Sequence, residues 1–561
     1  MAFQLSPGVN VSEVDLTTVV PSVLTTAGAF AGTFAWGPAD KVILVDNELT
    51  LINTFGKPDS NSATSFFTAA SFLAYGNNLS AVRAVGATSN NASAGASVVQ
   101  IKNSDVFESS YLSANNANAY GAFVGRYPGS LGNSLSVSVC ANSAVFSTWN
   151  YKSFFTSAPG TSDYVTAAGG TNDEMHIVVI DQDGLFTGTQ GTVLETYGFV
   201  SKASDASLNG STNYYRQVIF NQSKYVYSTD PVDYANTATN WGSTANTVFA
   251  SPPANQTVNL AEGSDATITE GNLESAYDLF SNKELIDISL VLTADASSNV
   301  QQYVIDNVAN SRKDCVAFIS PPSSAVVNNA GSESSSITSW LSTLARTSSY
   351  VVADSGWKYM YDKYNNVYRY VPLNGDIAGL CVNTDTIRDP WFSPAGFNRG
   401  QIKNAIKLAW NPNKTNRDVL YSAGVNPVVS FPGQGIVLYG DKTLQNKPSA
   451  FDRINVRRLF IVLEKAIGRA AEFSLFEFND EFTRAQFVAL VTPYLRDVQG
   501  RRGITDFRVV CDTTNNTPQI IDTNQFVGDI YIKPARSINF IQLNFVAVGT
   551  GVDFTTIVGA A

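Results

Sequence analysis

Apolar residues follow two different patterns along the chain, and the change between them divides it into parts. From 271 to 354, stretches with helical spacing alternate with short apolar runs; the helical stretches are ESAYDLF, QQYVIDNVANSR and 336–346, and the runs are 285–292, 314–320 and 349–354. Residues 27–87 show the same alternation, with apolar runs at 41–45 and 79–85 around a helical stretch that ends at Gly76. Helices placed between buried strands imply parallel pairing with right-handed crossovers. The pattern therefore predicts an α/β core that contains part of a doubly wound sheet.

A different pattern fills residues 88–270. This segment is rich in Ser, Asn, Thr and Gly, and its apolar residues alternate with polar ones, as at 134–140 and 175–181. Period-two alternation is typical of strands with one buried face. The segment also carries 14 acidic and 6 basic residues. We expect 88–270 to form an inserted, mostly β outer domain, which makes the chain an α+β or α/β multidomain protein.

The C-terminal part combines a hairpin, two helices and several strands. Residues 358–372 predict a hairpin that turns at Asn365-Asn366, because Asn tolerates the positive φ of tight turns. Helices are expected at 452–470 and about 483–498, and strands at 505–512, 526–533 and 537–548. On the first helix one arc is apolar, and the opposite arc carries Arg453, Arg457, Arg458, Lys465 and Arg469. We expect the apolar arc to pack and the other arc to present its cations.

The two ends of the chain have strand patterns without a neighbour to pair with. Residues 1–20 contain Pro7-Gly8 followed by Val9, Val11 and Val14, and no partner strand lies nearby in the sequence. In the last strand, Ile541, Leu543 and Phe545 alternate with other residues, and no helix follows to cover the edge. Unpaired strands can satisfy their backbone groups by joining the sheet of another subunit. The sequence thus predicts inter-subunit arms at 1–20 and about 540–561.

Composition narrows the class of protein. Charged residues make up 15% and the net charge is −11, which disfavours nucleic acid as a partner because phosphate binding depends on cations. The chain has no apolar run of 18 residues, and its first Lys or Arg is Lys41, so we expect neither a membrane span nor a signal peptide. The four cysteines lie far apart and are interpreted as small buried hydrophobic residues, as in a protein that matures in a reducing cytoplasm.

Three local patterns were weighed as sites of chemistry. His176 lies in an apolar run without a second His or a nucleophile. The segment GQGIVLYGDKT at 433–443 faintly resembles a phosphate-binding loop, but its Asp441 would repel a phosphate. Asp181-Gln182-Asp183-Gly184 resembles the start of a calcium-binding loop but lacks the Glu at position twelve. We therefore predict no catalytic, cofactor or metal site. Paired carboxylates for glycoside hydrolysis stay open, because their separation is a property of the fold.

Several long segments resemble the tail sheath protein of contractile-tailed, myovirus-type bacteriophages, in particular T-even-like sheaths. They are LSPGVNVSEVD near the N terminus, FAWGP at 34–38, KYMYDKYNNVYRYVPLNGDIAGLC at 358–381, WFSPAGFNRGQI at 391–402, LYGDKT at 438–443, FDRINVRRLF at 451–460, VVCDTTNNTP at 509–518 and IKPARSINFIQLNFVA at 532–547. The resemblance covers 1–87 and about 270–561, and YPGSLGNSLSVSV at 127–139 shares it more loosely. Longer members of the family carry an additional inserted outer domain. In this chain only about residues 88–120 correspond to that domain.

This resemblance implies a structural subunit and not an enzyme. Sheath subunits form hexameric rings stacked as a helix around a tail tube, in a metastable extended state on a baseplate, and a terminator protein completes the tail. Contraction drives the tube through the host envelope without cofactor, nucleic acid or membrane insertion by the sheath. The expected location is the virion, after assembly in the host cytoplasm.

Carried onto this chain, the resemblance implies five parts: an N-terminal arm at 1–20, a sheath domain at 21–87 plus 271–410, the outer domain at 88–270, a tube-facing and strand-accepting core domain at 411–545, and a C-terminal arm at 546–561. The arm residues are Leu5, Val9, Val11, Val14, Ile541, Leu543, Phe545, Val552 and Phe554. The tube-facing candidates are Arg457, Arg458, Lys465 and Arg469. The alternatives are a phage-borne polysaccharide hydrolase, which needs a cleft with paired carboxylates, and a surface adhesin, which needs an export signal.

Overall fold

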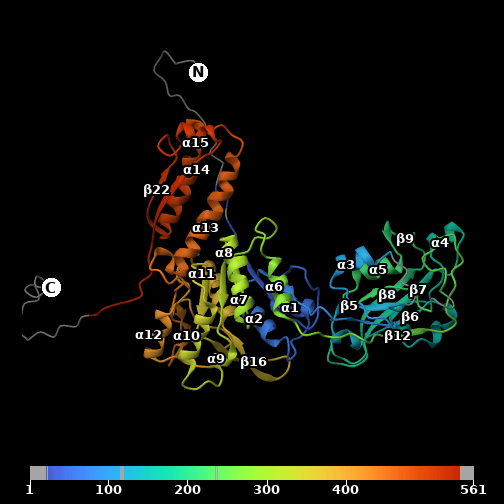
Figure 1. The fold of residues 1–561 in the computed structure, drawn as a ribbon. Helices are drawn as coiled ribbons and strands as arrows, with labels where there is room; N and C mark the ends of the chain where they lie inside the picture. Colours follow the sequence, from blue (N-terminus) through green and yellow to red (C-terminus); the bar gives the residue numbers. More distant parts are fainter. Residues whose placement is uncertain (1–19, 22, 114–118, 234–235, 237, 544–561) are drawn as a thin grey trace, which may run out of the picture. The chain divides into compact units, whose positions relative to one another are not determined.

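A computed structural model describes residues 20–21, 23–113, 119–233, 236 and 238–543 of the chain (Figure 1). The chain divides into two compact units, Met1–Leu475 and Phe476–Ala561. The predicted start of a C-terminal domain at residue 411 differs from this division. Residues 411–475 contribute a strand to the main sheet of the first unit and apolar side chains to its core, so they belong with that unit.

The first unit is built on a seven-stranded sheet. Its strands, in spatial order, are β19 (Val425–Asn426), β15 (Val351–Asp354), β14 (Val316–Ile319), β13 (Leu290–Leu292), β1 (Gly28–Gly32), β3 (Leu79–Arg83) and β2 (Ile43–Val45). All neighbours pair in parallel except β2 and β3, which are antiparallel. The predicted parallel pairing of the apolar runs is thus confirmed.

Helices cover both faces of this sheet because its strands are apolar on both sides. On β1, Phe30 belongs to one core cluster, while Ala29 and Ala31 belong to the other. The first cluster packs against α1 (Glu48–Phe55), α2 (Ala63–Leu73), α11 (Asn374–Ile387) and α13 (Ile454–Ala471). The second packs against α6 (Glu270–Asp278), α7 (Ser298–Tyr303), α10 (Glu333–Leu344) and α12 (Lys414–Ser422). A π-helical segment, Val304–Ala309, joins α7 to α8 (Asn310–Arg312), so the helix predicted from 301 is continuous but irregular.

Short strands lie beside the main sheet. The predicted hairpin forms from β16 (Trp357–Asp362) and β17 (Val367–Pro372), and Asn366 at its turn has φ 54°. Strand β18 (Lys407–Leu408) pairs with β16, β20 (Val428–Phe431) pairs with β21 (Gly435–Leu438), and α9 (Ser323–Val326) precedes α10. Among the described residues no helix is both long and apolar enough to cross a membrane.

The segment between β3 and α6 contains more strand than helix. A four-stranded sheet has the order β12 (Gln256–Asn259), β6 (Leu135–Cys140), β7 (Glu174–Asp181) and β8 (Thr192–Ser201), and a three-stranded sheet has the order β11 (Val226–Ser228), β5 (Phe123–Pro128) and β4 (Asn91–Ser93). A small pair, β9 (Ser207–Leu208) and β10 (Ser211–Thr212), and helices α3 (Ser104–Ser110), α4 (Asp163–Ala168) and α5 (Tyr215–Gln222) complete it.

The two ends of this insertion lie next to each other. The backbone N–H of Ala266 donates to the Ser89 Oγ at 3.0 Å, and a Cβ added to Gly86 would lie only 2.7 Å from the Ala266 Cβ. The buried Arg83 guanidinium joins the insertion to the sheet, because it donates to the carbonyls of Phe34, Gly37 and Pro128. The insertion therefore leaves and re-enters the core around the seven-stranded sheet at one place.

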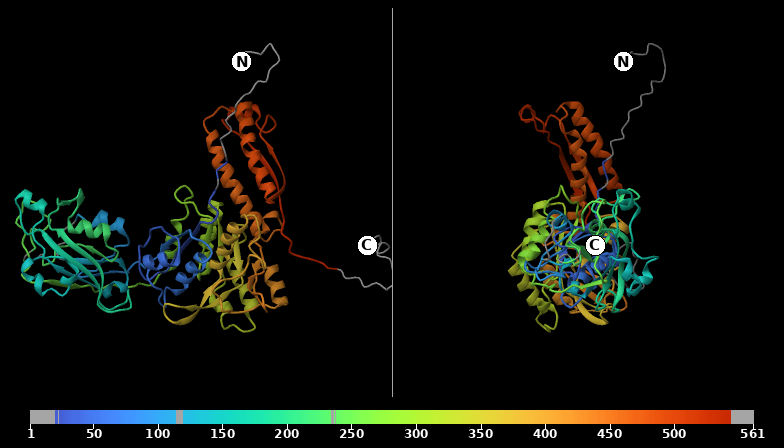
Figure 2. Two further views of the ribbon diagram at one scale, coloured as in Figure 1. Left: turned by 180° about the vertical axis from the view of Figure 1, so that it is seen from behind. Right: turned by 90° about the vertical axis from the view of Figure 1, so that its right-hand side faces the viewer.

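The described part of the second unit, up to residue 543, contains two helices and two strands. They are α14 (Glu481–Gly500), β22 (Ile504–Val510), α15 (Pro518–Asp522) and β23 (Asp529–Pro534). The strands pair antiparallel, and β22 packs along α14 (Figure 2). The helix and both strands were predicted. The further strand predicted at 537–548 is wrong for its described part, because residues 537–543 have no regular secondary structure.

Candidate assembly site

The β-ribbon of the second unit is too small to bury its own apolar side chains. One face of α14 places Phe487, Val491, Leu495 and Val498 in the core, and the Phe487 ring meets the Phe526 ring edge to face at 5.3 Å. Ile504 of β22 is buried as well, but five other apolar side chains of the strands stay half-buried; they are Phe507, Val509, Val510, Ile530 and Ile532. A sheet usually needs three or more strands for independent stability. This ribbon can therefore gain from a further strand.

A groove lies on the side of β22 that faces away from β23. It has a volume of about 510 Å³ and is lined by Ala485, Val488, Ala489, Thr492 and Pro493 of α14 together with Val509, Cys511 and Asp512. No residue of β23 lines it. The lining side chains on α14 are small, so an extended segment can approach the helix while it pairs with the edge of β22.

Pro493 adds a hydrogen-bond acceptor to this groove. Proline has no backbone N–H, so in the middle of α14 it cannot donate to the carbonyl of Ala489 four residues earlier. Both residues line the groove. The groove thus combines an unpaired strand edge in the described ribbon with a carbonyl that lacks its intrahelical donor.

The segment that follows β23 exposes large apolar side chains. Ile538, Phe540, Ile541 and Leu543 are 71–85% exposed. Two of them, Ile541 and Leu543, are predicted arm residues. The other predicted arm residues, Leu5, Val9, Val11, Val14, Phe545, Val552 and Phe554, lie outside the described residues, so the pairing of both arms stays a prediction.

The cationic arc predicted on α13 is not a free surface. The Arg458 side chain is 4% exposed. Its Nη1 donates to Asp385 Oδ1 at 2.7 Å and its Nη2 donates to Asp385 Oδ2 at 2.6 Å. Burial opposes its charge, but Asp385 more than compensates and raises the pKa of Arg458. Arg457 is 6% exposed and lies over the rings of Tyr350 and Phe451, at 4.2 and 4.0 Å. Burial lowers its pKa. The expectation of solvent-facing cations is wrong for both arginines, because the first unit itself supplies their partners.

The other two tube-facing candidates, Lys465 and Arg469, share one carboxylate. The Lys465 Nζ donates to Asp287 Oδ1 at 2.8 Å and to the Ile288 carbonyl, and its side chain is 9% exposed. Arg469 donates to Asp287 Oδ2 and is 42% exposed. Burial works against the charge of Asp287, yet these two cations keep its pKa lowered. Of the four tube-facing candidates, Arg469 is the one exposed enough to contact a tube, and that role stays a prediction.

The three patterns weighed for chemistry have structural roles. His176 is buried, its Nε2 lies 2.9 Å from the Ser157 carbonyl, its Nδ1 accepts from the Phe199 N–H, and burial lowers its pKa. Asp181 accepts hydrogen bonds from Ser134 and from the Phe186–Thr187 turn. Lys442 donates to the Tyr421 carbonyl. In the described part of the chain, no three His, Cys, Asp or Glu side chains are placed to hold a metal.

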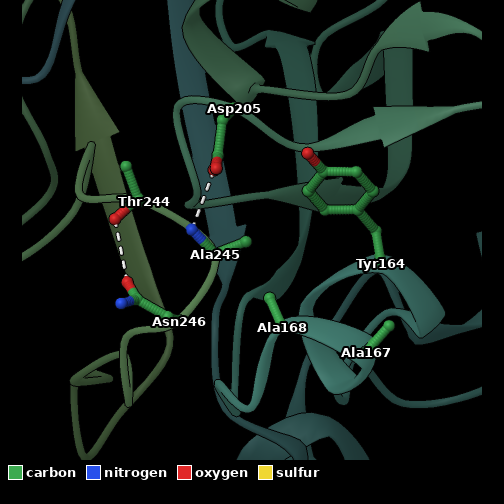
Figure 3. A pocket seen from close by; sticks show the side chains of 7 residues that line it. All are labelled: Tyr164, Ala167, Ala168, Asp205, Thr244, Ala245 and Asn246. Carbon is green, nitrogen blue, oxygen red and sulfur yellow. Dashed lines mark hydrogen bonds between the residues drawn. The ribbon is translucent and has the colours of Figure 1, made fainter.

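Two other hollows were examined for paired carboxylates, which a hydrolase would need. The larger, of about 1190 Å³, lies between the core around the seven-stranded sheet and the insertion and contains Asp59 and Asp265. Asp59 accepts from the N–H groups of Asn61 and Ser62, and Asp265 accepts from Ser130. A shallow pocket in the insertion contains Asp205, which accepts from the Ala245 N–H at 2.8 Å (Figure 3). Asp59 thus stabilises a local turn, whereas Asp205 and Asp265 each join segments that are distant in the sequence.

A mixed α/β body with an open strand edge and an exposed apolar end is typical of a subunit that binds other chains. Comparison with family models identifies the kind of subunit. The phage tail sheath central domain matches 266–444, the tail sheath C-terminal domain matches 446–547, and the N-terminal region of sheath domain III matches 25–84. The chain belongs to the tail sheath proteins of contractile bacteriophage tails.

Full-length relatives agree with this family. The tail sheath protein of Vibrio phage KVP40 is 34% identical over 670 aligned positions, which cover 99% of this chain and all of the relative. That of Enterobacteria phage T4 is 33% identical, with 99% of each chain covered. These alignments are longer than the 561 residues here, so the relatives contain residues that this chain lacks. The homologues are structural proteins of the tail.

Solved structures share the fold. A sheath tail protein from Listeria innocua has a TM-score of 0.53 at 10% identity, over 92% of this chain and 96% of the other. The contracted sheath complex of an extracellular contractile injection system has a TM-score of 0.51 at 12% identity, over 97% and 98% of the two chains. At these identities the comparison supports the α+β multidomain fold.

Proposed function

We propose that this sheath subunit polymerises as stacked hexameric rings around a tail tube and that its terminal arms join the rings by strand exchange. An arm of one copy adds a strand along the free edge of β22 in another copy. The backbone groups of both segments are then paired, and the half-buried side chains of the ribbon gain cover. The observation that carries this proposal is the groove between α14 and β22, which has an open strand edge along one side.

Such joints suit a structure that must move without coming apart. Backbone pairing in the groove holds two copies together, while the bodies that the arms connect are free to slide and rotate. Contraction then converts one packing of the same subunits into another, as in other bistable assemblies, and needs no nucleotide hydrolysis. The partners in this proposal are other copies of the chain, the tail tube protein, the baseplate and the tail terminator, in a virion assembled in the host cytoplasm.

Electron microscopy of truncated chains tests the proposal. The full chain should form striated hollow cylinders, and a chain ending at Leu543 should stay soluble and folded but form no long tubes. Removal of 114–118, which belong to the outer insertion, serves as the matched control and should leave the tubes intact. Long, regular tubes from the truncated chain would contradict strand exchange by the C-terminal arm.

A further inference from the structure

The turn that leads into α14 carries an exposed aromatic and acidic surface. In residues 476–482, FEFNDEF, the three Phe side chains are 75–105% exposed, and Glu477, Asp480 and Glu481 lie between them. The segment contains no Lys or Arg. Large apolar surfaces that stay exposed on a folded unit mark binding sites. We call this segment the acidic aromatic turn.

Side-chain hydrogen bonds at Asn479 hold this turn in place while its three rings stay exposed. The Arg484 side chain, which is 7% exposed, donates to the carbonyl and to the side chain of Asn479, and Asn479 donates to the Gln525 carbonyl at 2.7 Å. Phe476 has φ 69°, a left-handed conformation that is costly for a bulky side chain. Strain of this kind persists where the surroundings enforce it and is concentrated at functional sites.

The second exposed apolar surface of the same unit has the opposite charge. Residues 533–543, KPARSINFIQL, contain Lys533 and Arg536 but no acidic residue, and they include the four exposed apolar side chains described above. Lys533 is paired only with the exposed Asp506, a contact that is weak in water. We call this segment the cationic apolar segment.

The two surfaces lie at opposite ends of the unit. The acidic aromatic turn ends in the first two residues of α14, Glu481 and Phe482, whereas the Ala535 N–H donates to the Gly503 carbonyl just beyond the helix's last residue. The 20 residues of α14 span about 30 Å at 1.5 Å each. Seven residues from Arg536 to Leu543 span at most about 25 Å when fully extended. Ile538 and Phe540 therefore cannot reach the turn of their own chain.

We propose that the acidic aromatic turn of one copy binds the cationic apolar segment of a second copy. The inference rests on the proposed function, which it deepens by naming a contact beside the groove. On α14, Phe482 continues the stripe of Ala485, Ala489 and Thr492 by helical spacing, so a segment bound at the turn leads directly into the groove.

The geometry of this contact suits a polymer. Because the two surfaces differ, the contact is heterologous, and repeating it produces a ring or a helix instead of a closed pair. Apolar side chains supply the contact area, and the opposite charges select the partner and accelerate the encounter. Assembly should accordingly slow as salt concentration rises.

Cross-linking tests the contact directly. The chain's four cysteines are all buried, so new surface cysteines react selectively. F478C chains mixed with F540C chains should give a disulfide-linked dimer, and neither variant alone should do so. A mixture of L285C and F540C chains is the control, since Leu285 is 82% exposed but belongs to neither surface. No dimer above this control would overturn the proposal.

Charge reversal gives a second, independent reading. E477R and R536E should each slow assembly by about tenfold. The chain that carries both substitutions should regain most of the rate, because opposite charges then face each other again. Rates equal to the unchanged chain, or loss of attachment to a purified tail tube with normal sheath polymers, would overturn the contact between copies. Cross-linked dimers are measurable without tubes. Failure of the full chain to form tubes would thus reject the proposed function, while a missing cross-link in a chain that forms tubes would reject this contact alone.

Discussion

Arg458 of α13 and Asp385 of α11 form a two-point ion pair inside the first unit, with both side chains about 95% buried. The two residues lie 73 positions apart in the sequence, and their ion pair joins helices α11 and α13. Arg458 also donates to the carbonyls of Cys381 and Thr25, so its guanidinium ties three segments together. The residue that the helical pattern assigned to a binding surface is therefore part of the architecture.

Removal of this arginine should destabilise the first unit strongly. R458M leaves the Asp385 carboxylate buried without a partner, which typically costs about 3–5 kcal/mol. Urea unfolding followed by tryptophan fluorescence measures the first unit selectively, because all seven tryptophans precede residue 476. R346A removes the exposed pair with Asp306 and should cost less than about 1 kcal/mol. Equal losses in the two variants would show that the buried pair is not special.

Asp354 should make the first unit less stable as pH rises. Burial raises the pKa of this carboxyl to about 8. Hydrogen bonds from Ser320 and Gly356 act to lower the pKa, and the nearby Asp376 acts to raise it further. The folded chain therefore holds a proton that the unfolded chain loses near pH 4. The contribution of Asp354 is fully present below about pH 4 and disappears as pH approaches 8.

The isosteric variant D354N isolates this contribution. Between pH 5 and 8 the free energy of unfolding of the unchanged chain should fall relative to the variant, by at most about 1.4 kcal/mol per pH unit. Urea unfolding at several pH values gives the difference between the two slopes, in which other titrating groups cancel. Parallel slopes would mean that Asp354 is ionised in the folded protein.

Filling the groove should block assembly without harming the fold. Ala489 is exposed and lines the groove, so A489F occupies the space of the incoming strand and should reduce polymer formation by at least about tenfold. Gln486 is exposed on α14 but does not line the groove, and Q486F is the matched control. Sedimentation of polymer and thermal unfolding of the subunit give the two readings. A variant A489F that polymerises like Q486F would count against the groove as the acceptor.

The insertion should be dispensable for folding and for tube formation. Because Gly86 and Ala266 lie against each other, a short glycine linker in place of 88–265 closes the chain without moving the sheet. Arg83 then loses the Pro128 acceptor, and Trp36 loses its ring contacts with Tyr127 and Phe186, so a modest loss of stability is expected. Electron microscopy and tryptophan fluorescence measure both effects. Aggregation of the shortened chain would show that the insertion supports the core.

The strands of the main sheet were predictable because parallel strands buried on both faces are continuous apolar runs. Helix α11 was missed for a related reason. Ten of its 14 residues are buried, so it has no polar face to produce a helical period. Its Gly375 and Gly379 lie against Thr68 and Tyr75, where any side chain would collide. A Gly-x-x-x-Gly spacing was the signal available in the sequence.

The candidate site was predictable only in part. Alternation at the chain ends and the strands at 505–512 and 526–533 pointed to the second unit, whereas the groove depends on how α14 packs along β22. The cations of α13 were misinterpreted because helical spacing separates apolar from charged positions but does not reveal partners far away in sequence. Asp287 and Asp385 become neighbours of these cations only when the chain folds.

A helical reconstruction of the assembled sheath by cryo-electron microscopy tests the central claim most directly. The account predicts a strand along the edge of β22 that traces back to the terminal arm of a different copy. A bare β22 edge in a well-formed tube, or an edge occupied by the same chain's own C-terminal segment, would contradict it.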